Sequence, residues 1–149
     1  MKNQSSLSGV FALAAVITLA CGLEAQAPPA SADSHPVVES YYKMAPGKAD
    51  EWLELYRTQH LPVLKQRQRE GGILQIVIYR PFLHQGEPAW DFKVILTYLD
   101  FAALGDRTHF DAIERRLYPD WDAHQRAERH RWEITVKHWD DLMVAMPAD

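Results

Sequence analysis

The chain has 149 residues, of which 47% are hydrophobic and 24% are charged, and its formal net charge is −4. This composition is ordinary for one soluble globular domain. The negative charge argues against a nucleic-acid partner, because phosphate binding needs a clustered excess of lysine and arginine. Two basic clusters, within residues 65–69 and 126–131, lie beside glutamates, so we expect both to be solvated helix faces.

The first 27 residues differ in kind from the rest. Lys2 precedes the apolar run LSGVFALAAVITLACGL at residues 7–23, and small residues follow it. This order is typical of a signal peptide, so we expect an exported protein, periplasmic or secreted. Cys21, the only cysteine, lies where a lipoprotein would carry its lipid, although Thr18 departs from the usual lipobox. Without lipidation at Cys21 we expect no membrane contact beyond the signal peptide, and a mature chain without disulfides.

Residues 28–36 form a linker rich in proline, alanine and serine, and we expect the folded domain at residues 37–146. Residues 37–44 alternate as a half-buried strand does. After an Ala-Pro-Gly turn, a helix with acidic residues in its first turn runs to Gly71 and Gly72. Its apolar stripe consists of Trp52, Leu55, Tyr56, Val63 and Leu64.

Pro62 lies inside this helix. Because proline has no N–H, the carbonyl of Thr58, four residues earlier, loses its usual hydrogen-bond partner. We expect a kink that bends residues 63–69 around the sheet. His60 then lies beside the freed carbonyl.

The second half of the chain predicts three more strands and another helical region. Strands are expected at residues 73–82, 90–99 and 132–144, with a hairpin loop between the first two. Asp100 can cap a helical region that extends to residue 131 and is broken at Gly105 and Pro119. The order β-α-β-β-α-β is that of a ferredoxin-like α+β fold, a four-stranded antiparallel sheet with the helices on one face.

Strand alternation divides the expected sheet into two faces. One face is apolar enough to lie beneath the helices, and Ile134 and Val136 belong to it. The opposite face is mixed, with aromatic, aliphatic and charged members that pack on a second copy or remain solvated. Its polar and aromatic members include Glu39, Tyr41, Tyr79, Lys93, Thr135, Lys137 and Trp139.

The stretch YYKMAPGKADEWLELYRTQHLPVLKQ resembles the N-terminal unit of the NIPSNAP-like proteins of the dimeric α/β-barrel superfamily. The matching positions are Tyr42, Pro46, Gly47, Lys48, Trp52, Leu53, Leu61 and Pro62. The resemblance implies a homodimer whose two sheets face each other around a barrel-like space that often holds a ligand. The superfamily also contains cofactor-free monooxygenases, haem-binding or haem-degrading enzymes, and proteins without known activity, so the fold does not fix the function.

His60 is the first candidate for a catalytic residue, because it continues the stripe of Trp52 and Tyr56 and burial can shift its pKa. The alternative is a half-buried histidine that bonds locally. Glu39 is a second candidate if it pairs with Lys93 or Lys137. The mixed face predicts either dimer packing or a ligand site with aromatic walls, made of Tyr41, Tyr79, Lys93, Thr135, Lys137 and Trp139.

The sequence predicts no cofactor. No pair of histidines has metal-binding spacing, and a single axial haem ligand is conceivable only at His60, His109 or His138. Beyond the linker the chain has one serine and no cysteine or asparagine, which argues against a serine or cysteine hydrolase. Two functions stay open. One is a module that binds a small, partly apolar molecule or drives assembly. The other is a cofactor-free or haem-dependent monooxygenase-like enzyme.

Overall fold

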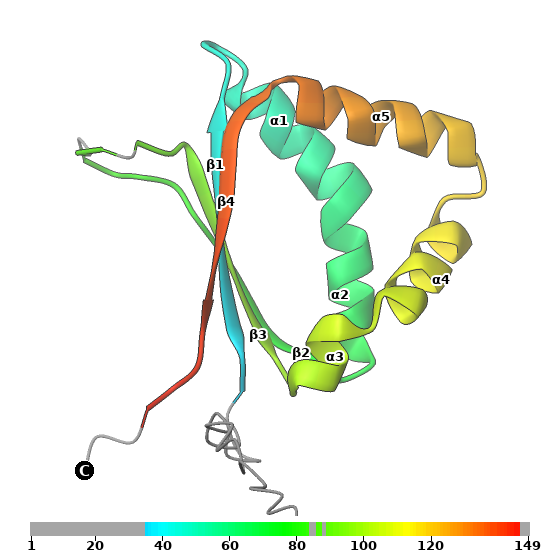
Figure 1. Cartoon of the computed structure of the whole chain (residues 1–149). Helices are drawn as coiled ribbons and strands as arrows, with labels where there is room; N and C mark the ends of the chain where they lie inside the picture. Colours follow the sequence, from blue (N-terminus) through cyan, green and yellow to red (C-terminus); the bar gives the residue numbers. More distant parts are fainter. Residues whose placement is uncertain (1–34, 84–85, 88, 147–149) are drawn as a thin grey trace, which may run out of the picture. The chain divides into compact units, whose positions relative to one another are not determined.

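The computed structural model describes residues 35–83, 86–87 and 89–146 (Figure 1). The expected signal peptide, Cys21 and residues 28–34 of the expected linker lie outside these residues. The elements follow in the order β1 (Val37–Met44), α1 (Ala49–Leu55), the π-helical turn η1 (Tyr56–His60), α2 (Leu61–Arg69), β2 (Ile73–Tyr79), β3 (Phe92–Tyr98), α3 (Phe101–Gly105), α4 (Arg107–Leu117), α5 (Trp121–Glu133) and β4 (Thr135–Met143).

The strands form one antiparallel sheet in the order β2-β3-β1-β4, and Figure 1 shows the helices on one side of it. This confirms the α+β, ferredoxin-like class expected from the sequence. The first and last strands along the chain, β1 and β4, are neighbours in the sheet. Residues near the two ends of the domain therefore lie next to each other.

The core lies between this sheet and the helices. Trp52 of α1 is fully buried and stacks on Tyr56 and on Phe92 of β3 at ring-centroid distances of 5.0 and 5.5 Å. Val63 and Ile113, from α2 and α4, are also fully buried. Asp100 caps α3 as expected, accepting a hydrogen bond from the Ala103 N–H at 2.7 Å.

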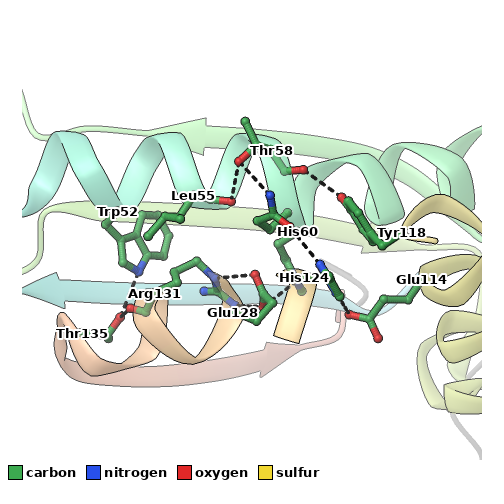
Figure 2. A network of polar contacts seen from close by, with 11 residues as sticks. Trp52, Leu55, Thr58, His60, Glu114, Tyr118, His124, Glu128, Arg131 and Thr135 are labelled. Carbon is green, nitrogen blue, oxygen red and sulfur yellow. Dashed lines mark hydrogen bonds and ion pairs between the residues drawn. The ribbon is translucent and has the colours of Figure 1, made fainter. Parts of the chain in front are cut away.

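Pro62 is accommodated differently from our expectation. Residues 63–69 are regular α-helix, and the irregularity lies before the proline, in η1, where the Leu61 N–H bonds the Tyr56 carbonyl five residues back. Pro62 thereby stands at the start of α2, where a missing N–H costs little. The freed carbonyl of Thr58 accepts a hydrogen bond from the Tyr118 hydroxyl at 2.9 Å (Figure 2).

Two β-bulges place some residues on a different face of the sheet from the one that simple alternation predicts. Lys43 pairs with Lys137 and Met44 with Thr135, so Val136 is the extra residue and is 62% exposed. Thr135 therefore lies on the helix side, where its hydroxyl accepts a hydrogen bond from the Trp52 indole at 2.9 Å. The prediction that Thr135 belongs to the mixed face is wrong, as is the placement of Val136 beneath the helices.

A second bulge lies at the start of β2, where the register shifts between Ile73 and Gln75. Ile73 is consequently buried in the core, and Leu74 is 43% exposed. The strands are also shorter than expected. β2 ends at Tyr79, β3 spans Phe92–Tyr98, and α5 continues to Glu133, so residues 132–134 are not strand.

The end of the expected linker belongs to the packed domain. The His35 imidazole Nδ1 lies 2.7 Å from the Leu99 carbonyl oxygen, and Pro36 is fully buried. Among the helices of the described residues, none has the length and apolar character that crossing a membrane requires.

Candidate functional site

A pocket of about 280 Å³ lies on the helix side of the sheet. Strands β1, β3 and β4 form one wall, and η1, α2, α3, α4 and α5 contribute to the rest. Its apolar lining comes from Val38, Leu64, Val94, Leu96, Leu104 and Phe110. Its polar lining includes Ser40, Tyr42, Tyr56, His60, Arg67, Tyr98, Arg131, His138 and Asp140.

The π-helical turn η1 carries His60 into this pocket. The His60 ring lies 5.3 Å from the ring of Tyr56 and 5.9 Å from that of Phe110, and 24% of its side chain is exposed. Burial lowers the pKa of His60 to about 4, and the positive charge of Arg131 acts in the same direction. The imidazole is therefore uncharged at neutral pH.

Arg131 of α5 is buried beside His60, as Figure 2 shows. Its guanidinium makes a two-point ion pair with Glu128, with Nε–Oε1 and Nη2–Oε2 distances of 3.1 and 2.7 Å. It also lies 4.8 Å from the ring centroid of Trp132. Burial opposes ionisation of Glu128, but the hydrogen bond and charge of Arg131 outweigh it and lower the pKa of this carboxyl group.

Arg67 of α2 is the second buried arginine of the pocket, only 5% exposed. Its Nη2 donates a hydrogen bond to the Ala103 carbonyl, and its guanidinium lies 5.5 Å from the ring centroid of Tyr98 and 6.0 Å from that of Phe110. Within the described residues no carboxylate oxygen lies within 4 Å of it, and its buried Nε has no hydrogen-bond partner. The prediction that both basic clusters are solvated faces is therefore wrong for Arg67 and Arg131.

Three tyrosines add neutral hydroxyl groups to the lining. Burial raises the pKa of Tyr42 to about 12, and it also raises the pKa values of Tyr56 and Tyr98. All three phenols thus remain protonated at neutral pH.

His138 of β4 lies beside one of these tyrosines. Its ring packs 4.5 Å from that of Tyr42, and its Nε2 lies 3.3 Å from Asp140 Oδ1.

A polar network joins η1 to α4 and α5 at one side of the pocket (Figure 2). The buried His124 ring lies 3.0 Å from Gln59 Oε1 through Nδ1 and 3.0 Å from Glu114 Oε1 through Nε2. It also stacks on Tyr118 at 4.0 Å. With the hydrogen bond from Tyr118 to Thr58, this network fixes the turn that carries His60.

The opposite, open face of the sheet carries the remaining candidates. Tyr41 and Trp139 stack at 4.8 Å, and Lys93 Nζ lies 3.4 Å from Glu39 Oε2. A second set of contacts extends this cluster. The Tyr41 hydroxyl bonds Glu39, Lys93 lies 5.4 Å from the ring of Tyr79, and Lys137 lies 5.2 Å from that of Trp139.

The hydrogen bond to Glu39 is the main reason why the pKa of Tyr41 is raised to about 12. The structure therefore brings Glu39, Tyr41, Tyr79, Lys93, Lys137 and Trp139 together on this face, and it places His60 and Thr135 on the other side of the sheet.

Of the three histidines considered as haem ligands, two line the pocket and one does not. His60 and His138 both line the pocket. His109 lies on α4 away from this pocket, and its Nε2 is 2.5 Å from Glu70 Oε2. Over the described ranges, no group of three histidine, cysteine, aspartate or glutamate side chains is placed to hold a metal ion.

No protein-family model matches the chain, and no curated protein matches its sequence. Solved structures do match. A dimeric ferredoxin-like protein from an uncultured marine organism is 10% identical with a TM-score of 0.50, over 79% of this chain and 93% of that one. A protein from Shewanella oneidensis is 12% identical with a TM-score of 0.51, over 76% and 92%. The chain has a ferredoxin-like fold.

The ferredoxin-like neighbours also include a NIPSNAP family protein from Agrobacterium tumefaciens. It is 15% identical with a TM-score of 0.48, over 76% of this chain and 93% of that one. Identities this low show the fold alone. What the site does must therefore be argued from its own residues.

Two buried charged residues of the pocket, Arg67 and Arg131, were not among the candidates expected from the sequence. A signal for Arg67 was present, because it continues the apolar stripe three and four residues after Leu64 and Val63. The buried face of α5 is harder to find, since only His124 and Arg131 are buried on it and both are polar. A helix whose buried residues are polar gives no hydrophobic period.

Proposed function

We propose that the protein is an exported homodimer that binds a small, partly apolar molecule in the pocket between the sheet and the helices. The observation that carries this proposal is the pocket itself, with an apolar wall and a few convergent polar groups. Its volume of about 280 Å³ lies just below the range of roughly 300–1,000 Å³ that is typical of ligand sites, so the ligand is expected to be small.

The polar groups of the pocket support recognition of a specific molecule. Tyr42 and Tyr98 remain protonated, and Ser40 adds a third hydroxyl. His60 is uncharged and offers a ring nitrogen. These groups come from three elements, β1, β3 and η1, so a ligand that contacts several of them is oriented as well as bound.

The open face supports the homodimer. A stack of Tyr41 and Trp139, together with Val77 and Ile95, leaves aromatic and aliphatic area on the side that no helix covers. Aromatic residues are enriched at subunit interfaces. The marine structure with the same fold is described as dimeric, and the resemblance to dimeric α/β barrels implies the same arrangement here.

Export rests on the sequence of residues 1–27, whose charged start and apolar run are those of a signal peptide. Lipidation at Cys21 is the alternative fate of the same segment. Mass spectrometry of the mature protein from its own host separates the two. A chain that keeps residues 1–27 would contradict export.

Binding is tested by comparing thermal stability with and without a panel of small apolar compounds, in the unaltered protein and in Val38→Phe. Val38 lines the pocket, so phenylalanine there fills it. We expect a rise in Tm for the unaltered protein that Val38→Phe abolishes. Val136→Phe, at an exposed bulge, is the matched control and should retain binding. Binding that survives in Val38→Phe would place the ligand elsewhere.

A monooxygenase-like enzyme is the second candidate, because the neutral His60 faces the pocket and could accept a proton from a ligand. A general base works best with a pKa near the operating pH. With a pKa of about 4, His60 is a weak base at neutral pH, so the geometry supports binding better than catalysis. Oxygen uptake with a panel of phenols, lost in His60→Gln, would reverse this order.

A further inference from the structure

The two buried arginines of the pocket differ in how their charge is balanced. Arg131 is 1% exposed and holds Glu128 through two hydrogen bonds. Arg67 is 5% exposed and bonds only a backbone carbonyl, that of Ala103. Its ring neighbours, Tyr98 and Phe110, supply cation–π contacts but no negative charge.

Three acidic groups lie on the elements around Arg67, and none of them forms an ion pair with it. Asp106 lines the pocket, but its Oδ1 accepts the His109 N–H at 3.0 Å. Asp140 lies 3.3 Å from the His138 ring. Glu70 pairs with His109 and Arg116 at 2.5 and 3.0 Å. In the described part of the chain, none of these carboxylates comes within 4 Å of the Arg67 guanidinium.

A buried guanidinium without a counter-charge is costly, because removal from water is not offset by an ion pair. The cost is removed when an anion enters the pocket next to it. The buried Nε without a hydrogen-bond partner shows that the protein's own groups leave this guanidinium incompletely satisfied.

We propose that the ligand of the pocket carries a carboxylate that binds the Arg67 guanidinium. Its apolar part then lies against Val94, Leu96 and Phe110, which line the same pocket. This inference rests on the proposed binding function and narrows it to apolar carboxylic acids. A small inorganic anion satisfies the charge of Arg67 but leaves the apolar wall uncovered.

Calorimetric titration with matched ligands tests the charge without altering the protein. The probes are 4-phenylbutyrate and octanoate, their neutral amides, and inorganic phosphate. We expect each carboxylate to bind at least about tenfold more tightly than its amide, because only the carboxylate forms a charge-assisted bond with Arg67. Phosphate should bind more weakly than either carboxylate.

Two variants locate the effect at Arg67. In Arg67→Met the preference for carboxylate over amide should disappear, while Arg67→Lys should keep part of it. Circular dichroism of both variants checks that the fold is retained. Since the comparison of carboxylate with amide in the unaltered protein needs no variant, a failure of Arg67→Met to fold leaves the test intact.

The possible failures are distinct. Equal binding of carboxylates and amides overturns the carboxylate proposal and leaves the proposed binding function standing. Binding of phosphate as tight as that of 4-phenylbutyrate overturns the apolar part of the proposal. If neither acids nor amides bind, both proposals fail.

Discussion

On the open face of the sheet, Lys93 lies 3.4 Å from Glu39 and Lys43 lies 2.9 Å from Asp91. On the helix-covered face, Arg67 has no such partner among the described residues, although it is 5% exposed. Two lysines of the open face thus bring their own counter-charges to a contact with an identical copy. A cavity with an unbalanced charge needs a partner of the opposite sign. The difference is the reason why we propose assembly for the open face and a ligand for the covered face.

The largest expected effect distinguishes the two arginines of the covered face. Arg131→Met should lower the free energy of unfolding by about 2–4 kcal/mol, because Glu128 then remains largely buried without its counter-charge. Arg67→Met should leave it unchanged or raise it by up to about 2 kcal/mol, because a buried charge is removed and no carboxylate loses a partner. Urea denaturation at one fixed protein concentration measures both values. Equal losses would show that both charges are balanced alike.

The next effect concerns the open face. Trp139→Glu removes the stack with Tyr41 and puts a second carboxylate on the face that carries Glu39. We expect the dimer to weaken by at least about 2 kcal/mol, roughly 30-fold in Kd. Analytical ultracentrifugation measures the change. Lys65→Glu, at an exposed position of α2 on the other side of the sheet, is the control that should remain dimeric. A fully dimeric Trp139→Glu protein would move the interface off this face.

A pH effect follows from His60. Its pKa is about 4 in the folded protein and near 6.5 when unfolded, so the unfolded chain binds the proton first as the pH falls. Stability is therefore lost progressively between these two values, by about 1–3 kcal/mol in total. His60→Gln should lose less stability than the unaltered protein when both are unfolded by urea at pH 7 and at pH 4.

His130 provides the control of opposite sign. Hydrogen bonds that the His130 ring donates to the Glu51 and Glu133 carboxylates raise its pKa, so its contribution is present at low pH and is lost as the pH rises through the raised value. His130→Gln should therefore remove stability at low pH only. If His60→Gln and the unaltered protein follow the same pH profile, His60 is not buried as the structure places it.

The smallest effect concerns the turn that positions His60. Tyr118→Phe removes the hydrogen bond to the Thr58 carbonyl and should cost about 0.5–1.5 kcal/mol. In a Pro62→Ala background the cost should be smaller, since an alanine at this position restores an N–H for the same carbonyl. A double-mutant cycle by urea denaturation measures the coupling. Additive effects would mean that Tyr118 does not substitute for the missing N–H.

The sheet could be predicted because its strands alternate regularly over most of their length. Alternation assigned Tyr41, Lys93 and Trp139 to one face and Tyr42, Phe92 and Val94 to the other, as the structure has them. It failed at Thr135 and Leu74, because each bulge adds one residue and reverses the pleat beyond it. Neither bulge carries a glycine that would mark it in the sequence.

The candidate site could be predicted only in part. His60 was identified because it continues an apolar stripe, and the structure places it in the pocket. The pocket itself depends on how α3, α4 and α5 lie over the sheet, and no local pattern encodes that arrangement. Arg67 could have been found, because it continues the stripe of Val63 and Leu64. Arg131 lies on a helix full of charged residues, where the sequence does not distinguish a buried arginine from a solvated one.

A crystal structure of the dimer grown with 4-phenylbutyrate tests the central claim most directly, because it compares both faces of the sheet in one experiment. We predict ligand density in the helix-side pocket, with the carboxylate at hydrogen-bonding distance from the Arg67 guanidinium and the ring near Leu96, and protein side chains between the two sheets. Ligand density between the sheets, with the helix-side pocket filled only by water, would contradict it.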